Sequence, residues 1–484
     1  MKKFLTVLFL TGLLTTRIAA AENSAKTAGA GRAILGINGD QKRIVVTAVT
    51  ADGSAIQVEG CTVTKLPSGE RTVLTATGAK VILKGAITEL DCGGNRLTEL
   101  NVQGLTALQK LFCDDNLLTS LDVSDVTALQ SLSCGENLLT SLDVSGLTGL
   151  RELYCNRNHL SSLDVQSLTA LQDLFCNANK LTSLNVQDLK VLQRLHCNSN
   201  RLTLLNVRDL SALQELDCVG NELTSLDVHG VTALWELECS KNMLTLLDVQ
   251  SLTSLSKLDC SANQLTSLDV RNLAALEELD CSNNKLTALY VQGLNALQEL
   301  NCSENELTSL EIQGLKTLQK LNCYKNKLTS LNVQGLTALQ WLNCGYNELT
   351  TLNLKGLHAL RDLECFKNNL PELDVQDINT LQRLNCYHNK LSTLELSTLH
   401  GLQELCCYDN LFNEKTLIRI LTALPDRKQK KEGRALIYGK KNDPREGTIT
   451  DFSSSAELKA AFEAAKAKNW RFYKRDTVGN EEEV

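Results

Sequence analysis

The segment 276–296, LEELDCSNNKLTALYVQGLNA, decides the fold because much of the chain repeats it with little change. Cysteine recurs at every twenty-first position from Cys92 to Cys407, sixteen times, and an asparagine follows three residues after each of these cysteines. The shared pattern is L-x-x-L-x-C-x-x-N-x-L-T-x-L-(D/N)-V-x-x-L-x-x. A fixed period of this length indicates a repeat architecture in which each turn packs mainly against its two neighbours.

Within each repeat, the residues around the cysteine alternate between apolar and polar. Leu279 and Cys281 flank Asp280, which predicts a short strand with one buried side. Stacked repeats place such strands in parallel at about 4.8 Å, and neighbours cover the leucines that one repeat alone would expose. The second half, L-T-x-L-(D/N)-V, is also β-prone. We therefore expect a β-solenoid with a parallel sheet on its concave face and extended or 3₁₀ structure on its convex side.

The asparagine of each repeat, such as Asn284, stands where the chain leaves the predicted strand. Its amide both donates and accepts hydrogen bonds, so it can serve backbone groups of its own turn and of the adjacent turn. We expect these amides to form a continuous ladder.

The cysteines raise the question of disulfides, which are common in exported proteins. Equivalent side chains of stacked parallel strands lie about 4.8 Å apart and point the same way, whereas a disulfide needs closer Cβ atoms and a crossed dihedral. We therefore expect reduced thiols that pack as small hydrophobes, with no cofactor. Metal binding or cross-linking is the alternative. The chain contains no C-x-x-C pair, which excludes a zinc finger.

The pattern L-x-x-L-x-C-x-x-N-x-L resembles the leucine-rich repeat, with cysteine where a leucine usually stands. The 21-residue period with its cysteine column is similar to internalin J and to the treponemal class of bacterial leucine-rich repeat proteins. The resemblance covers sixteen repeats over residues 87–410. It implies an exported or surface protein whose inner sheet binds another macromolecule, often in attachment to host or neighbouring cells.

The N-terminus has the composition of a targeting segment. Two lysines precede an apolar run over residues 4–14, and three alanines follow up to Ala21. This order predicts a secretory signal peptide over residues 1–21, followed by a flexible leader over residues 22–42. The rest of the sequence contains no run of about 18 apolar residues, so it predicts no transmembrane anchor. We expect an exported protein, and the sequence leaves secretion, the cell surface and the periplasm open as destinations.

The two ends of the repeat array differ from the repeats in composition. Residues 43–86 combine short β-prone runs with turns, which predicts a β-rich N-terminal cap. Residues 411–475 predict an α/β C-terminal cap, and residues 476–484 an acidic tail. We interpret the basic run 427–431 as a solvated loop.

The alternation places three residues of each repeat on the concave surface: those three before, one before and one after the cysteine. We call this surface the strand face. In the middle repeats it is mostly acidic, with Glu215, Asp217, Glu236, Glu238, Asp259, Glu278, Asp280 and Glu299. We interpret these carboxylates as a solvated belt; selection of a basic partner or a cation is the alternative.

Aromatic residues gather on the same face, although leucine and cysteine already fill the core. A C-terminal patch comprises Tyr324, Trp341, Tyr346, Phe366, Tyr387, His388 and Tyr408. An N-terminal patch comprises Phe112, Tyr154, Phe175 and His196. Rigid rings bury a large area at low entropic cost and are favoured in binding hot spots. We predict that both patches are contact sites; drift of exposed positions is the alternative.

The composition excludes several classes of function. The net charge is −7 without a clustered basic surface, so nucleic acid is not an expected partner. The six histidines accompany no catalytic or metal-binding motif, so we expect neither an enzyme nor a metal site. We expect an exported, non-catalytic protein that binds a protein or glycan on its strand face, as in adhesion. A self-associating, envelope-organising scaffold is the alternative, and the oligomeric state stays open.

Overall fold

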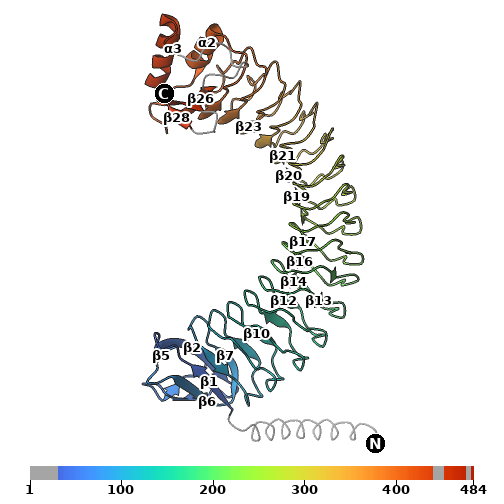
Figure 1. Ribbon diagram of the computed structural model, residues 1–484, viewed down its shortest axis with the longest axis vertical. Coiled ribbons are helices and arrows are strands. Elements are labelled where there is room, and N and C mark those ends of the chain that lie inside the picture. The colour runs from blue at the N-terminus through green and yellow to red at the C-terminus, as the bar shows by residue number, and fades with distance from the viewer. Residues whose placement is uncertain (1–30, 440–451, 476–480) are drawn as a thin grey trace, which may run out of the picture. The chain divides into compact units, whose positions relative to one another are not determined.

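The computed structural model describes residues 31–439, 452–475 and 481–484. The predicted signal peptide and the first part of the leader therefore lie outside the described residues. Contacts divide the chain into two compact units, Met1–Leu226 and Asp227–Val484. In each unit, irregular turns stack on one another and short strands line one edge of the stack (Figure 1).

The first unit contains one parallel strand for each repeat. These strands are β7 (Ile87–Asp91), β9 (Lys110–Phe112), β10 (Ser131–Ser133), β11 (Glu152–Tyr154), β12 (Asp173–Phe175), β14 (Arg194–His196) and β16 (Glu215–Asp217). The register joins equivalent residues of successive repeats, so Leu132 pairs with Leu111 on one side and Leu153 on the other. All three leucines are fully buried. The predicted parallel sheet with one buried side is confirmed.

The second unit repeats this arrangement and extends it at the C-terminal end. Its repeat strands are β17 (Glu236–Glu238), β18 (Lys257–Asp259), β19 (Glu278–Asp280), β20 (Glu299–Asn301), β21 (Lys320–Asn322), β22 (Trp341–Asn343), β23 (Asp362–Glu364), β24 (Arg383–Asn385) and β25 (Glu404–Cys406). Equivalent residues again lie side by side, as Asp259 and Asp280 do. Every strand-face column is therefore a continuous row within its unit.

The asparagine ladder forms as predicted. The Asn284 side chain accepts a hydrogen bond from the Leu265 N–H of the preceding repeat (2.9 Å). It also donates to the Cys260 carbonyl of that repeat (3.0 Å) and to the Cys281 carbonyl of its own (3.1 Å). Each buried asparagine thus binds two turns together and satisfies backbone groups that the strand leaves unpaired.

The cysteine column is buried and reduced. The eighteen cysteines all lie within the described residues and form no disulfide, and the sixteen of the repeats are fully buried. Burial disfavours the thiolate, so the pKa of Cys176, for example, is raised to about 12. The thiols are therefore protonated at neutral pH and act as small apolar side chains, as expected from their parallel stacking.

The side opposite the strands is extended and closed by tight turns. In one repeat the Leu273 N–H bonds to the Val270 carbonyl, and the Leu276 N–H bonds to the Leu273 carbonyl. These are bonds between residues three apart, as in a 3₁₀ turn. Two short strands, β13 (Leu184–Asn185) and β15 (Leu205–Asn206), also pair in parallel here. No α-helix is described within the repeats, because each turn reverses after a few residues.

A β-rich cap covers the first repeat. Its strands are β1 (Arg32–Gly36), β2 (Arg43–Thr50), β3 (Ile56–Glu59), β4 (Lys65–Leu66), β5 (Thr72–Thr75) and β6 (Lys80–Lys84). Strand β8 (Glu99–Asn101) of the first repeat pairs with β1 and so joins the cap to the repeats. Strand β2 pairs antiparallel with β7, the first strand of the stack. The Asn95 amide both donates to and accepts from the Val45 backbone (2.7 Å each). The cap therefore satisfies the first rung of the asparagine ladder.

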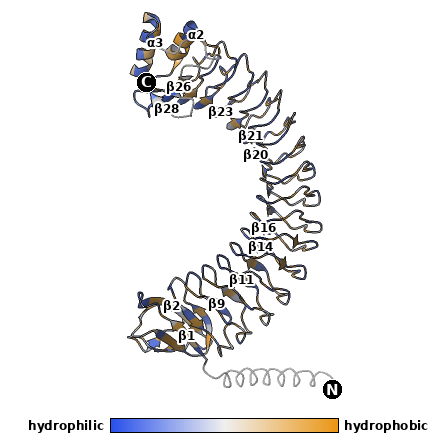
Figure 2. Ribbon diagram, in the orientation of Figure 1, coloured by the Kyte–Doolittle hydropathy of each residue, from blue (hydrophilic) through white to orange (hydrophobic). Residues whose placement is uncertain are grey.

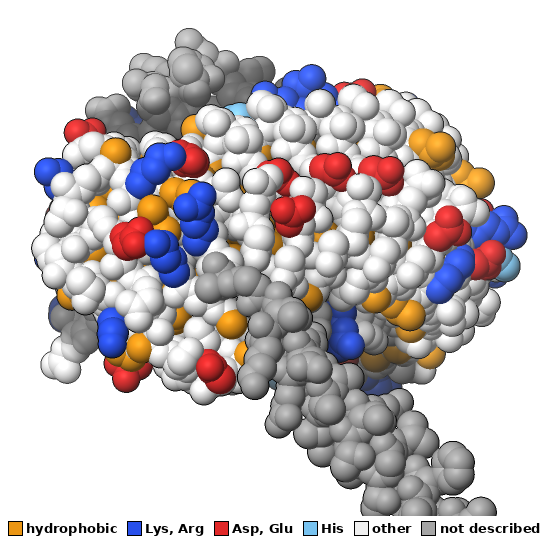
Figure 3. Space-filling model, turned by 90° about the horizontal axis from the view of Figure 1, so that it is seen from below, with side chains coloured by type: hydrophobic (Ala, Val, Ile, Leu, Met, Phe, Trp, Pro, Cys, Tyr) orange, Lys and Arg blue, Asp and Glu red, His pale blue; other side chains and the backbone are white. Residues whose placement is uncertain are grey.

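The prediction of a flexible leader over residues 22–42 was wrong for β1. This strand pairs antiparallel with β6 and β8, and Ala33 and Leu35 are fully buried. Both β1 and β2 are largely hydrophobic (Figure 2). The surface seen from below carries small, separate hydrophobic areas among uncharged and charged side chains (Figure 3). The apolar interior of the stack is therefore covered at this end, as terminal repeats require.

The C-terminal cap adds two helices and three strands. They are α2 (Glu414–Ala423), β26 (Gly433–Gly439), α3 (Ala456–Ala467), β27 (Trp470–Arg475) and β28 (Glu481–Glu483). Strands β26 and β27 continue the parallel sheet from β25, and β28 pairs antiparallel with β27. Part of the predicted acidic tail is thus a strand of the cap. Asn413 caps the N-terminus of helix α2, because its side chain accepts a hydrogen bond from the Thr416 N–H (2.9 Å).

The interpretation of 427–431 as a solvated loop was wrong for Arg427. Its guanidinium is buried and donates to the carbonyls of Leu402 and Lys431 (2.9 Å each). Burial lowers its pKa below the usual value for arginine. Arg427 therefore joins the cap to the last repeat and is not part of a free basic surface.

Candidate binding site on the strand face

The strand face of the second unit carries a row of rings where the chain leaves the strands. Tyr324, Phe366, Tyr387 and Tyr408 each follow a buried ladder cysteine. Phe366 and Tyr387 stack with ring centroids 4.9 Å apart and planes 8° apart, and Tyr387 and Tyr408 stack at 4.7 Å and 7°. Tyr324 reaches Phe366 at 5.9 Å. The structure therefore brings four predicted residues into one row, which we call the ring row.

A glycine allows Tyr324 to lie close to Phe366 although one repeat separates them. The position between Tyr324 and Phe366 is Gly345, and a Cβ atom there would lie 2.8 Å from the Phe366 ring. The phenyl ring thus occupies the space that a side chain would need. Because Phe366 and Tyr387 cover each other's faces, these rings offer mainly their edges to a partner.

The remaining residues of the C-terminal patch are placed differently. Tyr346 has φ 58° and is 44% exposed, and its ring lies 5.8 Å from Tyr324 with the Lys367 ammonium 4.3 Å from its centre. His388 has φ 54°, and its Nδ1 contacts the Asp409 carboxylate. Tyr346 therefore widens the ring row, whereas His388 packs against the next turn.

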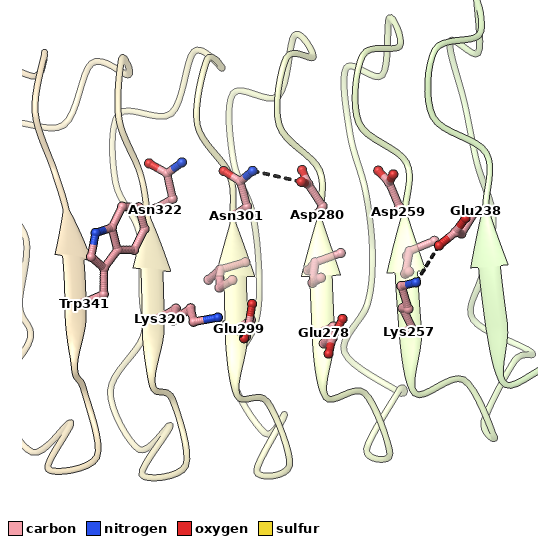
Figure 4. Close-up of a pocket in the computed structure, with 13 residues that line it drawn as sticks. Glu238, Lys257, Asp259, Glu278, Asp280, Glu299, Asn301, Lys320, Asn322 and Trp341 are labelled. Carbon is pink, nitrogen blue, oxygen red and sulfur yellow. Dashed lines mark hydrogen bonds and ion pairs between the residues drawn. The ribbon is translucent and has the colours of Figure 1, made fainter. Parts of the chain in front are cut away.

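Trp341 stands apart from the ring row, three residues before Cys344, on an open depression of about 500 Å³. Asp259, Glu278, Asp280 and Glu299 also line the depression, and Figure 4 shows Trp341 at one end and Glu238 at the other. The predicted belt thus contributes a hollow surface within this unit.

Lysines missed by the sequence analysis neutralise part of this depression. The Lys257 ammonium lies 2.7 Å from the Glu236 carboxylate and also contacts Glu238. Lys320 pairs with Glu299. The signal was present three residues before each cysteine, where a lysine follows two acidic residues in successive repeats, as in Glu278, Glu299 and Lys320. Only the remaining carboxylates are available to attract a partner.

A smaller hollow of about 200 Å³ lies at the end of the second unit. Cys406, one of the two cysteines outside the ladder, is half-buried there beside Tyr387 and Glu364. Burial raises the pKa of the Glu364 carboxyl, and the Arg383 charge partly opposes this. This hollow borders the ring row and gives it a polar margin.

The first unit carries its rings two positions earlier in the repeat, one residue before the cysteine and within the strands themselves. Tyr154 and Phe175 have centroids 4.9 Å apart, and Phe175 and His196 stack at 4.2 Å. Phe112 lies two strands from Tyr154, with Ser133 between them. The structure therefore brings three of the four predicted residues together and leaves Phe112 outside the stack.

An ion pair flanks this stack. The Arg194 guanidinium donates twice to the Asp173 carboxylate (2.7 Å each) and lies 5.6 Å from the Phe175 ring centre. His196 Nε2 is 3.6 Å from Glu215. Both Asp173 and Arg194 escaped the sequence analysis, because charged residues at this column are common and their pairing depends on register.

Two further kinds of feature are absent from the described residues. Among residues 31–439, 452–475 and 481–484, no three His, Cys, Asp or Glu side chains converge as a metal site would require. Over the same residues, no helix combines the length and the apolar character needed to cross a bilayer. Stacked rings, amides and carboxylates on a broad surface suit non-covalent recognition.

Comparisons with known proteins agree with this geometry. A family model described as leucine-rich repeats (2 copies) matches residues 253–296. The functional domain of InlJ from Listeria monocytogenes, which includes a cysteine ladder, is 33% identical, with a TM-score of 0.64 over 69% of this chain and 76% of that one. No curated protein matches the sequence. The chain therefore belongs to the leucine-rich repeat proteins, and its cysteine ladder is similar to that of InlJ.

Other solved structures share the fold. The leucine-rich repeat protein LIC12759 of Leptospira interrogans is 28% identical, with a TM-score of 0.54 over 63% of this chain and 91% of that one. The ectodomain of the Arabidopsis thaliana receptor kinase GASSHO1/SCHENGEN3 is 24% identical, with a TM-score of 0.59 over 70% and 46% of the two chains. A leucine-rich repeat solenoid is typical of protein-binding scaffolds.

Proposed function

We propose that this protein is exported and binds another protein through its strand face, without catalysis, and that it serves attachment to host or neighbouring cells. The observation that carries the proposal is the ring row. Leucine and cysteine, with one valine or isoleucine in most repeats, fill the apolar core, so these half-exposed rings are not needed to fill it. Large rigid side chains kept half-exposed on one face are typical of contact surfaces.

The arrangement of the rings favours a protein ligand over a glycan. A sugar ring stacks on the open face of an aromatic ring, but Phe366, Tyr387 and Tyr408 cover one another's faces. Their edges and hydroxyl groups suit peptide groups and apolar side chains instead. Membership of the leucine-rich repeat proteins, whose solenoids are typically protein-binding scaffolds, also supports this proposal.

Charge argues against self-association through the second unit. Two copies of this face would bring Asp259, Glu278 and Asp280 of one copy toward carboxylates of the other. Like charges placed opposite each other weaken an interface and suppress the wrong pairing. A scaffold built by this face is therefore the weaker candidate.

Attachment can be measured with beads that carry the purified chain. Fluorescent beads are added to cultured epithelial cells and to unrelated bacteria, and bound beads are counted. The double variant Phe366→Ser/Tyr387→Ser should lower the count about tenfold, because two hot-spot rings are lost. The control is Tyr290→Ser, since Tyr290 is 50% exposed in the second half of its repeat.

Two results would contradict the proposal. If wild-type beads attach to no cell type, adhesion is rejected. If Phe366→Ser/Tyr387→Ser and Tyr290→Ser lower the count equally, the ring row is rejected as the contact surface. Self-association is tested by sedimentation of the same proteins, where a dimer broken by Phe366→Ser/Tyr387→Ser would favour the scaffold. Protease treatment of intact producing cells tests export to the surface.

A further inference from the structure

The strand face of the second unit changes its chemistry halfway along. The column after the cysteine is serine in four successive repeats, at Ser240, Ser261, Ser282 and Ser303. From Tyr324 onward the same column holds the ring row. Small serines leave the neighbouring carboxylates open to a partner, whereas the rings present apolar surface. The face therefore has two adjoining sections, one over β17–β20 and one over β21–β25.

The first section is negatively charged. Its two other columns hold six carboxylates, one lysine and one asparagine: Glu236, Glu238, Lys257, Asp259, Glu278, Asp280, Glu299 and Asn301. Lys257 is already shared between two glutamates, and Glu299 pairs with Lys320. Asp259, Glu278 and Asp280 form no ion pair with any residue that the structure describes. They are adjacent on β18 and β19, so their charges add.

The open carboxylates lie in the depression that Trp341 closes at the far end (Figure 4). The Asp280 carboxylate is held in place by the Asn301 amide (2.9 Å) and the Ser282 hydroxyl (2.6 Å). Trp341 is half-buried, and its ring is the side chain best suited to attract a cation. Fixed carboxylates and an indole ring together favour lysine or arginine side chains.

We propose that the second unit selects an extended partner segment in two blocks, with a cationic block over β17–β20 and an apolar block over β21–β25. This inference rests on the proposed protein-binding function and names the chemistry of the partner. The cationic block meets Asp259, Glu278 and Asp280, and the apolar block meets the ring row. Charge complementarity sets both the position and the preference for a basic partner.

The geometry sets the length of the segment. Nine strands from β17 to β25 span about 38 Å at the usual spacing of about 4.8 Å, and an extended chain rises about 3.3 Å for each residue. A segment of about 12 residues therefore covers both sections. A shorter segment would reach the carboxylates or the rings, but not both.

Three labelled 12-residue peptides test the order of the blocks. The block peptide has six lysines followed by three Leu–Ser pairs, and the mixed peptide has the same composition with lysine and leucine interspersed. In the acidic peptide, glutamate replaces lysine. The block peptide should bind the whole chain at least about tenfold more tightly than the mixed peptide, because only it can match both sections. Its affinity should fall as salt rises.

A matched pair of variants tests the carboxylates. The variant Asp259→Asn/Glu278→Gln/Asp280→Asn removes three charges and keeps their hydrogen-bonding atoms. It should weaken the block peptide about tenfold. The control, Glu311→Gln/Glu348→Gln/Glu372→Gln, removes three exposed carboxylates elsewhere in the same unit, so the net charge is equal. It should change the affinity less than about twofold.

Equal affinities for the block and mixed peptides, equal effects of the two triple variants, or tight binding of the acidic peptide would each overturn the inference. The bead assay separates this failure from failure of the proposed function. Bead attachment that needs Phe366 and Tyr387 but ignores the strand-face triple variant would keep the function and reject the cationic block. Beads that attach nowhere would reject adhesion, and the peptides would still decide the inference.

Discussion

The two units build the same interior but place their rings on different columns of the strand face. In the first unit, Phe175 and its neighbours stand one residue before the cysteine, within the strand. In the second unit, Phe366 and its neighbours stand one residue after it, where the chain leaves the strand. The shift frees the column before the cysteine for carboxylates and amides in the second unit. One scaffold thus gives a mixed surface in one unit and two separate sections in the other.

The comparison shows which positions are free to vary. Leu174 and Leu363 are both fully buried at the centre of their strands, and the cysteines beside them are as well. Substitution there would open a cavity in either unit. The outward columns have no such constraint, so recognition can change without loss of the fold.

The largest expected effect tests the shared frame. Asn158→Ala in the first unit and Asn284→Ala in the second each remove hydrogen bonds to a buried N–H and to buried carbonyls of two repeats. Each change should lower the free energy of unfolding by about 3 kcal/mol, because backbone groups are left unpaired. Urea unfolding gives the magnitude, and hydrogen exchange at Leu139 and Leu265 shows whether the loss is local.

The control for this pair is Asn283→Gly. Asn283 is exposed with φ 53°, a conformation that glycine adopts without strain. Its effect should stay below about 0.5 kcal/mol. A large difference between the effects of Asn158→Ala and Asn284→Ala would show that the two units do not share one frame.

The next effect separates the units through their ion pairs. The Asp173 side chain is 9% exposed beneath Arg194, whereas the Asp362 side chain is 17% exposed beneath Arg383. Arg194→Ala should cost about 2 kcal/mol, because it leaves a buried carboxylate unpaired and uncovers Phe175. Arg383→Ala should cost about 1 kcal/mol or less. The midpoints of urea unfolding measure both costs. The control is Arg201→Ala, since Arg201 is exposed. Equal midpoints for Arg194→Ala and Arg383→Ala would contradict this ranking.

A smaller effect tests which side chain occupies the space beside a glycine in each unit. A Cβ at Gly345 would lie 2.8 Å from the Phe366 ring, and a Cβ at Gly135 would lie 2.8 Å from the Asn156 side-chain oxygen. Gly345→Ala should cost about 1 kcal/mol, because a packed ring must move. Gly135→Ala should cost less than about 0.5 kcal/mol, because a flexible amide can turn away. Thermal unfolding measures both, and near-ultraviolet circular dichroism should change only for Gly345→Ala.

Most of the fold could be predicted because the repeat is periodic. A buried leucine, cysteine or asparagine recurs at fixed spacing, so one repeat such as 276–296 determines the environment of the others. Strand β1 could not be predicted in this way, since its partners β6 and β8 lie far along the chain. Arg427 was misread for the same reason: the Leu402 carbonyl that it binds is distant in sequence.

For the candidate site, the sequence predicted only which face of the sheet each residue lies on, and not which side chains contact each other. Alternation correctly placed Phe366 and Tyr387 on one face, but their stacking depends on side-chain rotation and on the empty space at Gly345. The ion pairs of Lys257 and Arg194 also required the register between repeats. Sequence therefore indicates which side chains share a surface, and structure indicates which of them remain available to a partner.

The smallest expected effect is a dependence on pH that should have the same sign in both units. Burial raises the pKa of Glu364 in the second unit and of Asp114 in the first. Each folded state therefore holds the proton more readily than the unfolded chain. The stability that protonation provides is complete at low pH and is lost as the pH rises from the unfolded pKa through the raised folded pKa.

Glu364→Gln and Asp114→Asn keep a hydrogen-bond acceptor and remove this titration. Each variant should match the wild-type melting temperature near pH 4 and exceed it by about 1–3 °C near pH 7, since less than about 1 kcal/mol is involved. Thermal unfolding between pH 4 and pH 8 measures the difference. A gain that is constant over this range would mean that packing, and not the buried charge, separates the variants from the wild type. A gain for Glu364→Gln without a gain for Asp114→Asn would mean that the hydrogen bonds from Ser133 and Gly135 to Asp114 already offset its burial.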